Sequence, residues 1–277
     1  MAKKQPKLDD KLVILLTNHF IGGQTGTETW IKTMKEALKG HEVDTYSFTQ
    51  DEIPTKHYDL ALINHHTCLK ALENTPIETR IFTSHGVIPD LEQPIEGADY
   101  YVSVSEEVQD NLKEKGFEST VIRNPIDKDV FKPTNKVNKE LKNVLFMSNY
   151  PGNAGRIVEQ ACRGLNFKKI GGGNRVNNPQ DYINWADLVI TLGRGVLESM
   201  SCNRNVIVFD YNGGDGFIDE ETFLEYRKKN NSGRTNRIKY TPEELRKEFS
   251  KYNPDLELRH LVHSPEEIAN KYLEIPQ

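Results

Sequence analysis

The sequence of 277 residues has little of several features that would assign it to a specialised class of protein. It has three cysteines, and Cys68, Cys162 and Cys202 show neither paired nor metal-binding spacing. We therefore interpret each as a small buried apolar residue in a protein of a reducing compartment. No Asp-x-Asp motif occurs, and the neighbouring His65 and His66 have no partner at metal-binding spacing, so we expect no metal site.

Long hydrophobic runs are absent as well. The longest, LVILL and VIVF, have the length of strands and are too short to cross a bilayer. The first residues, MAKKQPKLDDK, carry charge without the apolar stretch of a signal peptide. We expect a cytoplasmic protein, with peripheral attachment to the inner membrane face as the other location that fits.

Positive charge is outnumbered by negative charge overall but is concentrated in one place. The net charge is −5 and the isoelectric point is about 6.0, which argues against binding nucleic acid through global positive charge. The stretch RKKNNSGRTNRIKY (227–240) nevertheless has six basic residues and no acidic one. Such a stretch is typical either of a solvated, flexible loop or of a docking surface for an anionic acceptor or surface.

Apolar runs alternate with amphipathic segments along the first half of the chain. We expect strands at 12–17, 42–47, 59–64, 80–84, 100–104 and 119–122, and helices at 27–38, 67–73 and 105–115. Strands that are apolar on both faces and alternate with helices predict a parallel sheet covered on both sides.

The pattern starts again after the polar stretch 133–142, which we interpret as a linker. Strands are expected at 143–148, 167–171, 187–191 and 205–209, and helices at 154–164, 179–185, 195–202 and throughout the tail from about 219. The sequence thus predicts two Rossmann-like, doubly wound α/β domains, 1–132 and 143–277. The cleft between them would be the binding place.

Three of the predicted strands end in paired glycines: Gly22 and Gly23, IGGG at 170–173, and Gly213 and Gly214. A loop that leaves a parallel strand and enters a helix presents free N–H groups, and glycine lets a phosphate approach them. The spacing is neither Gly-x-Gly-x-x-Gly nor a Walker sequence, so a Rossmann reductase or a P-loop kinase is not favoured.

Residues 186–210 carry a more specific pattern, in which a strand ends at Gly193 and a helix opens after it. The N–H groups of Gly195, Val196 and Leu197 would suit a diphosphate, and Arg194 could add a charge-assisted hydrogen bond. Glu198, one turn further, could accept two ribose hydroxyls or could simply complement the helix dipole.

This segment, LESMSCNRNVIVFDYNGG, resembles the donor-binding region of retaining GT-B glycosyltransferases, in particular glycosyltransferase family 4. Further segments agree in order: GGQTGTE (22–28), TSHG (83–86), VSVSEEVQDNL (102–112), VIRNPIDKDVFKP (121–133) and IGGG. The resemblance covers residues 12 to 216. It implies two domains facing across a cleft and transfer of a sugar from a nucleotide diphosphate sugar to a hydroxyl, with retention and without a metal.

The resemblance also implies roles for individual residues. His85 and Glu198 are the expected catalytic residues, and His85 would position or polarise the donor. The expected donor-binding residues are Gly22, Gly23, Thr25, Arg156, Gly172, Arg194, Gly195, Val196, Leu197, Gly213 and Gly214. Acceptor contacts are expected from His19, His66 and Asp215. No cofactor is expected besides the donor, a UDP- or GDP-sugar in the first instance.

Two alternatives remain open. The acceptor would most commonly be a glycan or glycolipid, but the basic stretch 227–240 also fits an acceptor such as hydroxymethylated bases of viral DNA. The chain also departs from the family pattern, because Ile190 stands where the first of two glutamates is usual, and no lysine follows Arg156 at the usual spacing. A nucleotide-sugar-binding protein without turnover is therefore the second alternative.

Overall fold

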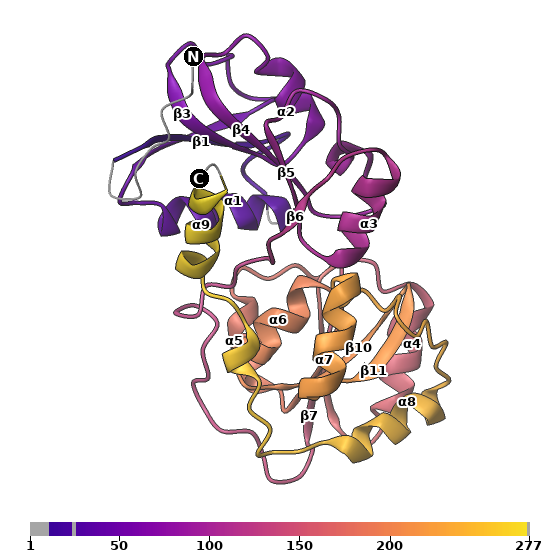
Figure 1. Cartoon of the computed structure of the whole chain (residues 1–277). Helices are drawn as coiled ribbons and strands as arrows, with labels where there is room; N and C mark the ends of the chain where they lie inside the picture. Colours follow the sequence, from indigo (N-terminus) through magenta and orange to yellow (C-terminus); the bar gives the residue numbers. More distant parts are fainter. Residues whose placement is uncertain (1–10, 24–25, 276–277) are drawn as a thin grey trace. The chain divides into compact units, whose positions relative to one another are not determined.

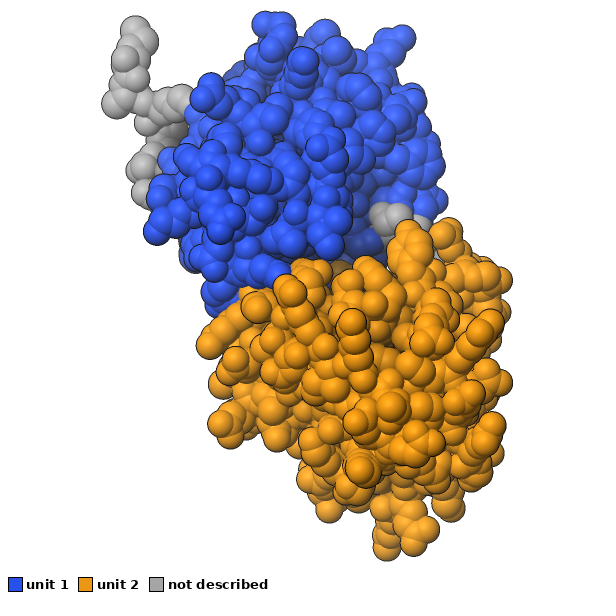
Figure 2. Space-filling model, turned by 90° about the vertical axis from the view of Figure 1, so that its right-hand side faces the viewer, with its two compact units in different colours: residues 1–125, 263–277 blue, residues 126–262 orange. Residues whose placement is uncertain are grey.

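The computed structural model describes residues 11–23 and 26–275 and divides the chain into two compact units. Unit 1 comprises residues 1–125 and 263–277, and unit 2 comprises residues 126–262 (Figure 2). Each unit is built on its own β-sheet, with helices between most of the successive strands (Figure 1). The alternating apolar runs therefore predict the α/β class correctly.

The unit 1 sheet pairs six strands in parallel, in the order β2-β1-β3-β4-β5-β6. The strands are β1 (Val13–Asn18), β2 (Glu42–Ser47), β3 (Tyr58–Ile63), β4 (Ile77–Ser84), β5 (Tyr100–Ser103) and β6 (Thr120–Val121). The helices are α1 (Gly26–Ala37), α2 (His66–Ala71), the 3₁₀ turn η1 (Asp90–Glu92), α3 (Glu106–Glu114) and α9 (Pro265–Glu274). Every strand and helix predicted for this half is present.

Both faces of the unit 1 sheet are buried, which explains its continuous apolar strands. Ile14 and Leu16 pack with Trp30 of α1 and Tyr272 of α9 on one face. Leu15, between them in sequence, packs on the other face with the cluster that includes Leu69 of α2. Because successive side chains of a strand point to opposite faces, a strand covered on both sides must be apolar at consecutive positions.

The unit 2 sheet has the order β11-β10-β9-β7-β8. The strands are β7 (Asn143–Met147), β8 (Asn166–Ile170), β9 (Leu188–Thr191), β10 (Asn205–Asp210) and β11 (Gly213–Phe217), of which β11 runs antiparallel to β10 and the others are parallel. The helices are α4 (Gly152–Ala161), α5 (Pro179–Trp185), α6 (Arg194–Ser201), α7 (Glu220–Tyr226) and α8 (Pro242–Glu248), and the 3₁₀ turns are η2 (Arg227–Lys229), η3 (Phe249–Lys251) and η4 (Arg259–Leu261).

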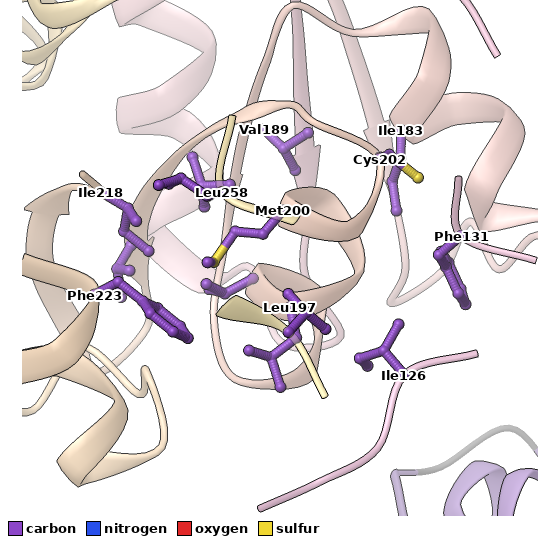
Figure 3. Packing of buried hydrophobic residues seen from close by; sticks show 14 of the residues in the cluster. Ile126, Phe131, Ile183, Val189, Leu197, Met200, Cys202, Ile218, Phe223 and Leu258 are labelled. Atoms are coloured by element: carbon purple, nitrogen blue, oxygen red, sulfur yellow. The ribbon is translucent and has the colours of Figure 1, made fainter. Parts of the chain in front are cut away.

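Apolar side chains from several helices and strands of unit 2 pack together on one face of its sheet. Leu197 and Met200 of α6 lie in a cluster with Val189 of β9, Phe223 of α7 and Leu258 (Figure 3). The opposite face is covered by a second cluster, which includes residues of α4 and α8. Helix α6 is therefore held firmly against the sheet, and this fixes where its first turn lies.

The division into units differs from the predicted domain boundaries in two places. Residues 133–142, predicted as a linker, belong to unit 2, because Asn184 Oδ1 accepts the Thr134 N–H at 3.0 Å and the buried Asp187 accepts N–H groups of Asn138 and Lys142 at 2.8 and 3.0 Å. The last helix, α9, belongs to unit 1 rather than to the C-terminal domain, because its apolar face packs into the cluster of α1.

We predict that the hydroxyl of Tyr272 stabilises unit 1. The Tyr272 hydroxyl lies 3.0 Å from Thr83 Oγ1, and both residues are buried. The substitution Tyr272→Phe therefore leaves the buried Thr83 hydroxyl without this hydrogen-bond partner. The free energy of unfolding should fall by about 1–2 kcal/mol in urea titrations followed by circular dichroism. The control Tyr100→Phe alters a tyrosine that is 40% exposed and should change it by less than about 0.5 kcal/mol. Equal stability of the two variants would contradict the prediction.

Candidate functional site

The carboxyl edge of the unit 2 sheet has the topology of a ligand site. From β7 the chain passes to β8 on one side and then to β9 on the other side. In open parallel sheets, ligands bind at the carboxyl ends of the strands where the strand order reverses in this way. The reversal lies between β7 and β9, so the loops of residues 148–151 and 192–193 border it.

The first turn of α6 is closed by backbone hydrogen bonds. Gly193 N–H donates to Asn231 O at 2.8 Å, while the N–H groups of Gly195 and Val196 donate to Leu192 O and Gly193 O at 3.2 and 3.1 Å. Bonds of this 3₁₀ type are one way in which a helix start satisfies its N–H groups. The structure thus gives Gly195 and Val196 partners other than the predicted diphosphate.

Arg194 and Glu198 form an ion pair with each other. Arg194 Nε donates to Glu198 Oε1 at 2.9 Å, and the two side chains are 17% and 12% exposed. Burial raises the pKa of the Glu198 carboxyl, and the charge of Arg194 counteracts this rise. A nucleotide that bound Arg194 and Glu198 as predicted would either have to accept further hydrogen bonds from the intact ion pair or break the pair.

Three of the predicted donor-binding glycines of unit 2 are explained by close packing of protein groups. A Cβ on Gly195 would lie 2.5 Å from Thr191 Oγ1 and 2.6 Å from Met147 Cε, and one on Gly214 would lie 2.7 Å from Val208 O. Gly213 has a φ of +99°, and a Cβ there would lie 3.2 Å from the backbone of Arg237. Gly213 and Gly214 thus form the start of β11, whereas the sequence predicts a loop folded over the donor.

Two further donor-binding candidates of unit 2, Gly172 and Arg156, border the carboxyl edge. Gly172 follows β8 with a φ of +53°, and a Cβ on it would lie 3.3 Å from Asn149 O in the loop after β7. Arg156 is exposed on α4, the helix that this loop enters. Both therefore stay close in the fold to the point where the strand order reverses.

Asp215 is buried and holds backbone in place. It is 2% exposed, and its carboxylate accepts the N–H of Asn236 at 2.8 Å. Burial raises the pKa of Asp215, and hydrogen bonds from backbone N–H groups of the same segment lower it. This partner explains why the stretch 227–240 is anchored rather than a loose solvated loop, and it gives Asp215 a partner other than the predicted acceptor.

The structure adds residues at this edge that sequence reasoning missed. Ser148 after β7 donates to Asp210 Oδ2 at the end of β10, at 2.5 Å, and Asp210 Oδ1 has no partner among the described residues. Burial raises the pKa of Asp210 to about 6, and the bond from Ser148 works against this rise. The exposed rings of Tyr150 and Tyr211 meet edge to face, 6.0 Å apart. The sequence signal that could have identified Ser148 and Asp210 was a polar residue at the end of each of two apolar strands.

In unit 1 the strand order reverses between β1 and β3, and the predicted glycine loop follows β1. Gly23 N–H donates to Glu28 Oε1 at 2.9 Å, and a Cβ on Gly23 would lie 2.5 Å from this carboxylate. Glu28, 3% exposed, is thus a residue that sequence reasoning missed. Gly22 has a φ of +140° beside the ring of Phe20, and Thr25 lies outside the described residues.

The histidines predicted as site residues all follow strands at this edge. His85 Nε2 lies 3.0 Å from Asn64 Oδ1, and its ring meets Trp30 edge to face at 5.6 Å. The buried His65 accepts the N–H of His19 at 2.9 Å.

Burial, together with smaller contributions from His19 and His66, lowers the pKa of His65 to about 4, so the ring of His65 is neutral near pH 7. His66 Nδ1 lies 3.0 Å from Asp90 O. The structure therefore gathers His19, His65, His66 and His85 at the carboxyl edge of unit 1.

One group of side chains has the spacing of metal ligands within the described residues. His57, Asp59 and Glu78 place one ligand atom each within 4.8 Å of one another. They lie at the starts of β3 and β4, at the edge opposite to the histidines described above. In the same described part of the chain, every helix is too short or too polar to span a bilayer.

Comparison with known proteins finds a likeness in fold. No protein-family model matches the chain, and no curated protein matches it in sequence. Among solved structures, it is similar to AviGT4, "a glycosyltransferase involved in Avilamycin A biosynthesis", with a TM-score of 0.61. The match covers 96% of this chain and 97% of that chain at 15% sequence identity. The chain therefore shares the fold of a glycosyltransferase over nearly its full described length.

We predict that Gly195 is required by packing even when no ligand is bound. In Gly195→Ala the new methyl group would overlap Thr191 and Met147, which should lower the free energy of unfolding by about 1–3 kcal/mol. Gly173→Ala is the matched control, because a Cβ at Gly173 meets nothing within 4 Å. Urea unfolding of the free protein measures both. A Gly195→Ala variant as stable as the control would show that the packing argument is wrong.

We also predict a pH-dependent effect of Asp210→Asn. Because the folded-state pKa of Asp210 is raised from 3.8 to about 6, its contribution to stability is complete below pH 3.8 and is lost as the pH rises through about 6. Asparagine does not ionise, so the melting temperature of the variant minus that of the wild type should rise over this interval and then level off.

The control for this experiment is Asp219→Asn, which should give the opposite trend. The pKa of Asp219 is lowered, first by the backbone N–H of Thr222, so its contribution is lost as the pH falls. The melting-temperature difference for this variant should therefore rise toward low pH. A difference for Asp210→Asn that stays constant with pH would contradict the assignment.

Proposed function

We propose that this protein is a glycosyltransferase that moves a sugar from a nucleotide diphosphate sugar to a hydroxyl acceptor. One observation carries the proposal: the chain shares the fold of a glycosyltransferase over 96% of its length, and its family-4-like segments lie at or beside strand ends of that fold. The GT-B arrangement of two facing domains, retention of configuration and independence of metals are the finer parts of the proposal. They rest on the resemblance of the motifs.

Unit 2 is the proposed donor side. The residues around its strand-order reversal include Gly172 after β8, the Arg194–Glu198 pair at the start of α6, and Ser148 with Asp210. In the reaction, the bond between the anomeric carbon and the diphosphate oxygen breaks, and its electron pair stays on the diphosphate. Positive charge aimed at that oxygen lowers the barrier. The acceptor oxygen forms the new bond to carbon, and its proton is released.

Unit 1 is the proposed acceptor side, and His85 is its principal residue. Because the Asn64 side-chain carbonyl oxygen only accepts, His85 Nε2–H donates the hydrogen bond to Asn64 Oδ1. The edge contact with Trp30 fixes the plane of the ring. Such a fixed imidazole suits positioning of a sugar hydroxyl or a phosphate oxygen. The proposed acceptor is a hydroxyl of a glycan or glycolipid.

A donor screen with activity measurements tests the proposal. A bound ligand raises stability, by about 2.7 kcal/mol at one hundred times its Kd, so UDP-, GDP-, ADP- and CMP-sugars can be compared by thermal shift. We expect a UDP- or GDP-sugar to stabilise the protein and to release its nucleoside diphosphate on turnover.

His85→Asn should lower the turnover of this donor at least about tenfold. The control His57→Asn alters an exposed histidine at the opposite edge of the same sheet, so it should leave turnover unchanged. No stabilisation and no turnover with any of the four classes of donor would refute the proposed function. Stabilisation without any turnover would favour a binding protein.

A further inference from the structure

The basic stretch of residues 227–240, called the basic segment below, is ordered on the surface of unit 2. It begins with η2 directly after α7 and runs to Tyr240 before α8. It contains Arg227, Lys228, Lys229, Arg234, Arg237 and Lys239 and no acidic residue. A run of like charges normally repels itself into a loose conformation, so its fixed backbone needs a cause.

The first half of the basic segment is packed against the loop that enters α6. Asn231 O accepts the N–H of Gly193 at 2.8 Å. Gly233 has a φ of +76°, and a Cβ on it would lie 2.5 Å from Gly213 O and 3.2 Å from Leu192 Cδ2. Residues 230–233 therefore touch the strand end and the helix start that border the proposed donor site.

The second half is pinned to β11. Gly214 and Ile238 exchange two backbone hydrogen bonds, at 2.9 and 2.8 Å. The buried Asp215 accepts the N–H of Asn236. This one buried carboxylate also offsets part of the positive charge of the segment. The sequence GGDG thus holds the basic segment in place. Its glycines lie where the backbones of β11 and the basic segment come close together, and Asp215 accepts hydrogen bonds from N–H groups of the basic segment.

Two buried polar atoms at the contact with α6 have no partner among the described residues. They are Asn231 Oδ1 and Ser232 Oγ, in residues that are 2% and 8% exposed. Buried polar atoms are nearly always hydrogen-bonded, because leaving one without a partner is costly. A phosphate oxygen beside this turn would accept a hydrogen bond from Ser232 Oγ, whereas Asn231 Oδ1 only accepts and would need a hydroxyl or N–H group of the ligand.

The donor site also lacks charge from its predicted source. Arg194 is paired with Glu198, and the N–H groups of Gly193, Gly195 and Val196 are taken by carbonyls. A diphosphate needs cations that approach from elsewhere. Lys229 and Arg234 flank the turn 230–233 on both sides, and Lys229 Nζ donates to Arg234 O at 3.4 Å, so the two positions are held close together.

We propose that the basic segment forms one wall of the diphosphate site, where Lys229 and Arg234 neutralise the phosphates beside the start of α6. This inference rests on the proposed function and names the source of its positive charge. The ligand is the diphosphate of a nucleotide sugar, and the same chemistry includes free inorganic pyrophosphate.

The test measures binding of UDP, GDP, inorganic pyrophosphate and the nucleosides uridine and guanosine to the full chain by calorimetry at two salt concentrations. In the double variant Lys229→Gln/Arg234→Gln, the Kd for a diphosphate should rise about tenfold or more, because charge-assisted hydrogen bonds are lost. Its dependence on salt should weaken, since fewer charges take part. Affinity for the nucleosides should not change.

Two further variants complete the design. Lys136→Gln/Lys139→Gln removes two exposed lysines before the start of β7, at the opposite edge of the sheet, and should leave all Kd values unchanged. Lys229→Arg/Arg234→Lys keeps the charge and should keep most of the affinity. Circular dichroism checks that each variant is folded, and the salt dependence of the wild type gives a measurement that needs no variant.

The outcomes separate this inference from the proposed function. If the wild type binds pyrophosphate through Lys229 and Arg234 but no nucleotide, the anion wall stands and the proposed function fails. If UDP or GDP binds with unchanged Kd in the double variant, the inference fails alone. Binding of duplex DNA is measured as well. If the double variant loses DNA binding but keeps its affinity for diphosphates, the basic segment binds a polyanion instead, and the inference is overturned. Absence of all diphosphate binding overturns both.

Discussion

Parallel pairing of strands is the constraint on which both candidate sites depend. Because β7, β8, β9 and β10 run in one direction, residues as distant in sequence as Ser148 and Asp210 reach the same edge and form a hydrogen bond of 2.5 Å. The same rule brings Asn64 and His85 together in unit 1. The apolar cores on both faces hold these strand ends in register, so the polar residues that follow them are positioned by packing far from the sites.

Features that depend on neighbouring residues could be predicted from the sequence. Consecutive apolar residues such as Ile14, Leu15 and Leu16 indicate a strand buried on both sides, whatever lies around it. The Thr-Pro-Glu-Glu and Ser-Pro-Glu-Glu patterns of the tail predict helix starts, and Thr241 and Ser264 form capping boxes there. The fold class followed from the alternation of such apolar strands with helices.

Features that depend on distant partners could not be predicted in the same way. A glycine shows that something approaches the backbone closely, but not what approaches: for Gly195 it is Thr191 and Met147, and for Gly171 it is Ser148 O. The Arg194–Glu198 pair could have been predicted, because residues four apart on a helix lie side by side and opposite charges at this spacing attract. The burial of the pair could not be predicted, since it depends on the packing of α6 in unit 2.

The burial of Asp215 gives a physical reason for the sequence around it. Burial disfavours the charge of this carboxylate, and backbone N–H groups of the basic segment, that of Asn236 first, offset part of the cost. The carboxylate therefore orders the segment and leaves its basic side chains to other partners. Removing its charge would loosen the positions of Lys229 and Arg234 relative to α6, although Asp215 contacts neither side chain in the hydrogen bonds described. Asp215 of β11 thus holds the basic segment in the position where it can take part in the chemistry proposed for the start of α6.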